Sequence, residues 1–104
     1  MAGLVLYDNP ASSNAQKVRF LLAETGTAYV RREVPFARPR PDWYLAINRR
    51  GLIPALGDGD LVLSESHAIL RYVAARSGRD DLYPMDDAVG RARIDEFLDR
   101  FATG

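Results

Sequence analysis

Short apolar runs alternate with helix-length segments along this chain of 104 residues. The continuous run at residues 4–7 predicts a strand buried on both faces, and the alternating stretch at residues 29–34 predicts a second strand. The segment between them predicts a helix that ends at Gly26, a residue type common just beyond helix C-termini. The apolar positions of this helix are Val18, Phe20, Leu21 and Leu22.

Residues 48–73 predict a strand, a tight turn, a second strand and a helix. Pro54 has no N–H group to donate within a sheet, so the Ile53–Pro54 step marks the entry to a strand or a special turn. The Gly-Asp-Gly-Asp sequence at residues 57–60 is typical of a hairpin turn. The Ser-Glu-Ser sequence at residues 64–66 predicts a helix start, because hydroxyls can cap a helix and an acid stabilises its first turn.

Two further helices complete the expected order. The proline-rich bend at residues 35–41 leads into a short helix at residues 42–48, and a last helix covers residues 86–104. Its apolar positions are Val89, Ala92, Ile94, Phe97, Leu98 and Phe101. We expect the first strand to be central, beside the strand that follows Ile53–Pro54, with the hairpin at the far edge of the sheet.

The composition narrows the class of protein. The chain is 47% hydrophobic, which indicates a packed core, and its length suits one domain. It has no cysteine, which excludes a disulfide framework, a thiolate metal site and a Cys-x-x-Cys redox pair. A net charge of zero argues against general nucleic-acid binding, and no apolar run is long enough to span a membrane. The N-terminus lacks the basic start of a secretion signal, so we expect a cytoplasmic protein.

The charges are unevenly distributed. Residues 17–50 carry eight basic side chains against three acids, a net charge of +5, and residues from Gly51 onward carry six arginines against ten acids, a net charge of −4. Two interpretations stay open at this point. The charges can simply cover solvated faces, or the basic half can provide a field that suits a small anion.

The combination of an Ile53–Pro54 step, a short hairpin and a Glu65–Ser66 helix start resembles the N-terminal domain of cytosolic glutathione S-transferases. The resemblance implies a thioredoxin-like α/β fold, β-α-β-α-β-β-α with a mixed sheet, plus the first helix of an all-α domain. The expected boundaries are residues 1–78 for the thioredoxin-like domain, 79–85 for a linker and 86–104 for that helix. The resemblance covers the whole chain but only about half of the usual protein.

The resemblance also implies a binding site for glutathione, the co-substrate of the family. In that family the proline is cis, the backbone of the residue before it (here Ile53) pairs with the cysteinyl part of glutathione, and Glu65 and Ser66 hold the γ-glutamyl end. Arg38 and Arg40 are candidates for the group that binds the glycyl carboxylate, although the proline-rich segment can also be a rigid surface loop. A thioredoxin-like fold without cysteine has to take its sulfur from a ligand.

The start of the first helix carries the candidate for thiol activation. Ser12 lies six residues before Val18, the spacing of the active serine in the serine-type classes (phi, theta and zeta). Ser12 can instead be a helix cap, but Ser13 and Gln16 have the spacing of a capping box, which would leave Ser12 free to face a ligand. Two rivals stay open. Other classes use a tyrosine at the end of the first strand, here Tyr7, and some bacterial members use an asparagine nearby, here Asn14.

The function implied is attack of the glutathione thiolate on a small electrophile, as in detoxification. A non-catalytic binding or interaction module of the same fold is the alternative, and a glutathione-dependent reductase or dehalogenase is a third. The apolar stripe containing Phe97, Leu98 and Phe101 predicts a homodimer or another self-association. We expect no metal, because the single histidine, His67, has no evident partners, and we expect it at a surface or an interface.

Overall fold

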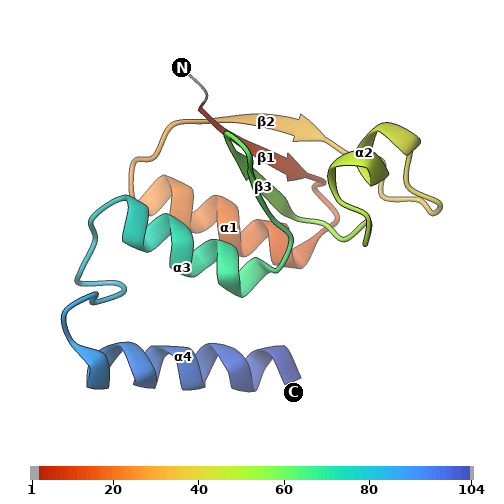
Figure 1. Ribbon diagram of the computed structural model, residues 1–104. Helices are drawn as coiled ribbons and strands as arrows, with labels where there is room; N and C mark the ends of the chain where they lie inside the picture. Colours follow the sequence, from red (N-terminus) through yellow and green to blue (C-terminus); the bar gives the residue numbers. More distant parts are fainter. Residues whose placement is uncertain (1–2, 104) are drawn as a thin grey trace.

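The structure is a computed structural model that describes residues 3–103. Helices and strands follow one another along this part of the chain as Figure 1 shows. In chain order they are β1 (Leu4–Asp8), α1 (Ser13–Glu24), β2 (Tyr29–Glu33), α2 (Asp42–Ile47), β3 (Ala55–Asp58), β4 (Leu61–Leu63), α3 (Ser66–Arg76) and α4 (Ala88–Thr103). This is the order of elements that the sequence predicts.

The four strands form one mixed sheet in the order β2-β1-β3-β4. β1 runs parallel to β2 and antiparallel to β3, and β3 pairs with β4 in a hairpin. The first strand is therefore central and the hairpin lies at the far edge, as predicted. The Ile53–Pro54 peptide bond directly before β3 is cis, as expected, and the Arg38–Pro39 bond is cis as well, which the sequence did not indicate.

The main core lies between the sheet and helices α1 and α3, which run side by side (Figure 1). Its fully buried members are Leu4, Leu6, Val18, Leu22, Leu56, Ile69 and Val73. Burial alternates along β1, where Leu4 and Leu6 are fully buried and Val5 and Tyr7 only partly. The prediction that both faces of this strand are buried was wrong, because the two long helices of the domain cover one face and only short segments reach the other.

A second, smaller core cluster surrounds α2 and the Ile53–Pro54 step. It contains Ala15, Val34, Tyr44, Ile53 and Ala55, with Tyr7 and Trp43 packed against it. Figure 1 shows α2 beside the carboxyl ends of β1 and β2, apart from α1 and α3. Tyr44 is fully buried, and its hydroxyl donates to the carbonyl oxygen of Leu52. Burial raises the pKa of Tyr44. Its protonated hydroxyl ties α2 to the segment that leads into Ile53.

Phe20 departs from the predicted core. Its side chain is 69% exposed, whereas Val18 and Leu22 are buried and Leu21 packs against the main core. A helix buries a stripe little more than 100° wide. Phe20 follows Val18 by two residues, which turns its side chain to the opposite side of α1.

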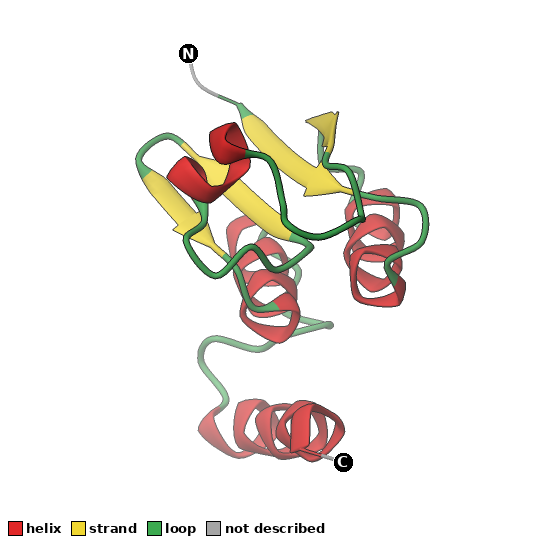
Figure 2. Cartoon of the chain, turned by 90° about the vertical axis from the view of Figure 1, so that its right-hand side faces the viewer, coloured by secondary structure: helices red, strands yellow, loops and turns green. Residues whose placement is uncertain are grey.

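Helix α4 lies next to α3 and away from the sheet, as Figures 1 and 2 both show. Arg71 of α3 forms ion pairs with Asp95 and Asp99 of α4, at 2.9 and 2.8 Å. Phe97 and Phe101 of α4 are 59% and 65% exposed, with ring centroids 4.8 Å apart. Ile94 and Leu98 of α4 also face the domain, where they line a small apolar cavity with Leu21, Leu70 and Ala74. Ion pairs and apolar residues therefore both join α4 to the domain, and Phe97 and Phe101 stay largely uncovered.

A buried carboxylate joins three elements at the end of β1. Asp8 is fully buried, and its two oxygens accept from the guanidinium groups of Arg19 in α1 and Arg31 in β2, the latter at 2.6 Å. The hydrogen bond to Asp8 raises the pKa of Arg31. The backbone of Asp8 also accepts from the N–H of Val34 at 2.8 Å. Asp8 thus fixes α1 and β2 to the point where β1 ends.

We expect Asp8→Asn to lower the free energy of unfolding by about 3 kcal/mol, because it leaves two guanidinium groups without the buried charge that balances them. Urea unfolding followed by circular dichroism measures this. Glu33→Gln is the control, because Glu33 is an exposed partner of Arg31 and its loss should cost at most about 1 kcal/mol. Equal effects of the two substitutions would contradict the special role of Asp8.

Candidate functional site

Ser12 is the cap of α1. Its hydroxyl oxygen accepts from the N–H of Ala15 at 3.1 Å, and the residue is only 5% exposed. The capping box predicted for Ser13 and Gln16 was wrong, because Ser13 is already the first residue of the helix. A turn in which the N–H of Ser12 donates to the carbonyl of Asn9 at 3.0 Å places Ser12, and not Ser13, at the helix start.

The same hydroxyl also joins α1 to the cis-proline step. The Ser12 hydroxyl donates to the carbonyl oxygen of Ile53 at 3.3 Å, across 41 positions of sequence. Ile53 and Pro54 are both buried at this point. The structure therefore brings together three of the residues that the sequence singled out, at the N-terminal end of α1, where the helix dipole favours negative charge.

Tyr7 packs against the smaller core cluster, which contains Ile53 and Ala15. Its side chain is partly buried, and its ring packs at 5.7 Å from the ring of Tyr44 and over Gly57 of β3. Successive side chains of a strand point to opposite faces, so Tyr7 faces away from Leu6 and the main core. The ring of Tyr7 thus packs within the cluster around α2.

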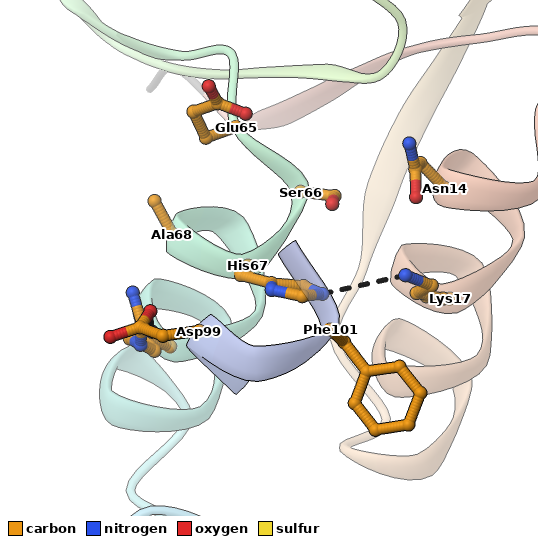
Figure 3. Close-up of a pocket in the computed structure, with 9 residues that line it drawn as sticks. Asn14, Lys17, Glu65, Ser66, His67, Ala68, Asp99 and Phe101 are labelled. Atoms are coloured by element: carbon orange, nitrogen blue, oxygen red, sulfur yellow. Dashed lines mark hydrogen bonds and ion pairs between the residues drawn. The ribbon is translucent and has the colours of Figure 1, made fainter. Parts of the chain in front are cut away.

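A cleft of about 460 Å³ opens between the N-terminal parts of α1 and α3 and the C-terminal part of α4. Its lining residues are Asn14, Lys17, Glu65, Ser66, His67, Ala68, Arg71, Asp99 and Phe101. Figure 3 shows Asn14 and Ser66 facing the same space from opposite helices. Glu65 and Ser66, predicted as a pair, therefore open onto this cleft, and Ser12 and Ile53 lie outside its lining.

Glu65 precedes the first residue of α3, Ser66, and its side chain makes no capping bond. The carboxylate instead pairs with Arg50 at 3.0 Å, and both side chains are more than half exposed. Such exposed pairs are weak, so a ligand cation can replace Arg50 at small cost.

The only lysine and the only histidine of the sequence meet in the cleft (Figure 3). The Nζ atom of Lys17 lies 3.5 Å from Nε2 of His67. Burial, followed by the nearby charge of Lys17, lowers the pKa of His67, so the ring is neutral at pH 7 and Nε2 accepts from the ammonium group. His67 thus lies where α1, α3 and α4 meet, which agrees with the expectation of a surface or interface residue.

Sequence reasoning missed Lys17, Arg71 and Asp99 as lining residues of the cleft. They come from three different helices, so no spacing along the chain links them. The described residues 3–103 contain no group of three or more side chains suited to hold a metal ion. None of the helices in this part of the chain combines the length and the apolar character that crossing a membrane requires.

The two arginines predicted for a carboxylate lie outside the cleft. Arg40 is buried, and its guanidinium donates to the carbonyl of Gly51 at 2.8 Å and to that of Phe36. Its charge is therefore engaged with backbone oxygens of two loops. Arg38 is exposed, in the bend before α2.

Comparison with protein families gives a match over most of the chain. The model of the glutathione S-transferase, N-terminal domain, matches residues 6–80. Glutathione S-transferase 3 of Zea mays is 39% identical over 99 residues, covering 90% of this chain and 44% of that protein. Glutathione S-transferase GstB of Escherichia coli is 35% identical over 102 residues, covering 92% of this chain and 48% of that protein.

Solved structures agree. The theta class glutathione S-transferase of Xanthomonas axonopodis pv. citri, with glutathione bound, has a TM-score of 0.83 at 38% identity, over 95% of this chain and 48% of that one. Human glutathione S-transferase T1-1 in its apo form has a TM-score of 0.85 at 31% identity, over 97% of this chain and 43% of that one. The chain thus spans less than half the length of these relatives, and its fold is the thioredoxin-like α/β fold. Because the family model matches well over half of the sequence, this chain belongs to the glutathione S-transferase family and corresponds to its N-terminal domain followed by one helix.

Proposed function

We propose that this chain binds glutathione and lowers the pKa of its thiol, so that the thiolate can attack an electrophilic small molecule. The observation that carries the proposal is the Ser12 hydroxyl, held at the N-terminal end of α1 against the carbonyl of Ile53. A relative of similar fold has been solved with glutathione bound, which supports the same ligand here.

The γ-glutamyl end of glutathione has a carboxylate and an ammonium group, and the cleft offers a partner for each. Ser66 supplies a hydroxyl in the first turn of α3, where free N–H groups and the helix dipole favour a carboxylate. Glu65 supplies a carboxylate for the ammonium once Arg50 is displaced. Ile53 would pair its backbone with the cysteinyl unit, between this end and α1.

Thiol activation requires that the site stabilise the thiolate by about 2.7 kcal/mol, which corresponds to lowering the thiol pKa by about two units. A thiol pKa near 8.5 leaves only a few per cent of thiolate at pH 7, and lowering the pKa by about two units makes the thiolate the major form. A hydrogen bond from Ser12 to sulfur and the dipole of α1 both favour the anion. The Ser12 proton is engaged with Ile53 at 3.3 Å, a long bond that is readily given up, and the cysteinyl N–H of the ligand can replace it there.

We assign binding of the glycyl carboxylate to Arg38, which is exposed in the bend before α2. We assign Arg40 to bracing that bend, because its guanidinium is buried against the carbonyls of Phe36 and Gly51. In the reaction the sulfur forms a bond to an electrophilic carbon, the leaving group departs with its electron pair, and the thiol proton goes to solvent.

A second candidate function is a glutathione-binding or interaction module without turnover. The exposed Phe97 and Phe101 of α4 favour it, because they present an apolar surface suited to another polypeptide. Turnover with a generic electrophile such as a chlorodinitrobenzene separates the two, since a module without chemistry binds glutathione and forms no conjugate. A glutathione-dependent reductase or dehalogenase would start from the same thiolate.

We expect Ser66→Ala to weaken glutathione binding by about 1.5–3 kcal/mol, as for a lost hydrogen bond to a charged group. The Kd measured by calorimetry should rise about 10- to 150-fold. Ser77→Ala is the matched control, because Ser77 donates to Ala74 at the opposite end of α3. An unchanged Kd for Ser66→Ala would mean that the hydroxyl does not touch the ligand.

We expect the chain to self-associate through α4. Light scattering should show a mass above that of the 11.6 kDa monomer, and Phe97→Ser with Phe101→Ser should restore the monomer. Phe20→Ser is the control, because Phe20 is just as exposed but lies on α1. A monomeric wild-type chain, or an equal response to the control, would rule out this surface.

We expect Ser12→Ala to leave glutathione bound and to raise the pKa of its bound thiol by about one unit or more, because the hydroxyl acts on sulfur and other groups hold the ends of the tripeptide. The ultraviolet absorbance of the thiolate, followed against pH, measures this pKa. Ser12→Gly should give the same shift with less loss of helix capping.

Tyr7→Phe tests the rival residue and should leave the thiol pKa unchanged. If Tyr7→Phe moves the titration and Ser12→Ala does not, the tyrosine is the thiol partner. If the wild-type chain binds glutathione with an ordinary thiol pKa, the module without thiol activation is the better description.

A further inference from the structure

Asn9 is a buried amide next to the candidate site and has no place in the proposed chemistry. It is 8% exposed and follows the last residue of β1. Its side-chain NH2 donates to the carbonyl of Val34 at 2.8 Å, and its side-chain oxygen accepts from the N–H of Ala11 at 2.9 Å. Its own carbonyl accepts from the N–H of Ser12 at 3.0 Å.

These bonds fix the loop that carries Ser12. The Val34 bond attaches the loop to the chain just beyond β2, and the Ala11 bond closes a turn of the type that asparagine side chains form with their own backbone. The amide fits in one orientation only, because turning it over would set two acceptors against each other at Val34 and two donors at Ala11. A buried side-chain amide whose donor and acceptor groups both have partners makes its surroundings rigid.

Ser12 depends on this loop for its position. Its hydroxyl has to remain within reach of two groups, the N–H of Ala15 at 3.1 Å and the carbonyl of Ile53 at 3.3 Å. The second distance is already near the upper limit for a hydrogen bond, so a small shift of the loop breaks the contact with the cis-proline step.

We propose that Asn9 is the positioning residue of Ser12: by attaching residues 9–12 to the end of β2, it holds the hydroxyl where the sulfur of bound glutathione is ionised. The inference rests on the proposed function, in which Ser12 acts on that sulfur. Asn9 itself is not among the residues that line the cleft. Its effect should therefore appear in the ionisation of the bound thiol and not in the anchoring of the tripeptide.

The test uses the full chain and glutathione, with two variants. Asn9→Ala removes both side-chain bonds, and Asn9→Asp keeps the bond from Ala11 but sets a carboxylate against the carbonyl of Val34. We expect both to raise the pKa of the bound thiol, Asn9→Ala by about one unit, and to change the Kd of glutathione less than about threefold.

A double substitution shows whether Asn9 acts through Ser12. Asn9→Ala combined with Ser12→Ala should give the thiol pKa of Ser12→Ala alone, because the hydroxyl that Asn9 positions is then absent. Thr25→Val is the stability control, since Thr25 donates to the carbonyl of Leu21 at the far end of α1. It should lower the melting temperature and leave the thiol pKa in place.

The outcomes are distinct. A thiol pKa that Asn9→Ala does not move, or that the double substitution raises beyond Ser12→Ala, overturns the proposal. So does an equal shift from Thr25→Val, which would make the effect one of general stability. If the wild-type thiol is not activated at all, the proposed function fails and the role of Asn9 in ionisation fails with it. Amide hydrogen exchange at Ala11 and Ala15 then reports separately whether Asn9 fixes the loop.

Discussion

The buried carboxylate of Asp8 must be balanced by positive charge, and meeting that requirement arranges the elements around the end of β1. Its oxygens hold Arg19 of α1 and Arg31 of β2, so a helix and an edge strand are both fixed to the central strand. The residue that follows, Asn9, extends the same attachment to the start of α1. Two ion pairs of Asp8 and the Asn9 amide therefore fix the position of the α1 N-terminus, to which the candidate site belongs.

Much of the fold follows from patterns that the sequence carries locally. The hairpin needs residues that tolerate positive φ, and Gly59 indeed has φ of 60°. The Ile53–Pro54 step stands directly before β3, where proline has no ladder bond to make. The sequence did not indicate which side of each helix is covered by another layer. Phe20 belongs to an apolar set in the sequence, but nothing local says that no layer covers that side of α1.

In the candidate site, too, local motifs predicted some features, and contacts between distant parts of the chain decided others. Glu65 and Ser66 are neighbours in the chain and line the same cleft, so a short motif was enough to predict that they lie together. Ser12 and Ser13 are neighbours too, and a serine at either position can cap a helix. The choice between them depends on the turn to Asn9 and on the carbonyl of Ile53, which no local pattern contains.

Ser12 has two duties, and the geometry allows them to coexist. The oxygen of its hydroxyl accepts from Ala15 and thereby starts α1, and the proton is directed at Ile53. Capping uses a lone pair of the oxygen, whereas thiol activation uses the O–H as a donor, so a ligand sulfur can accept a hydrogen bond from Ser12 without unwinding the helix. In the proposed complex the ligand amide would take the place of the Ser12 proton at Ile53. Binding of the peptide backbone would then release the donor that the sulfur requires, which links anchoring to activation through a single carbonyl oxygen.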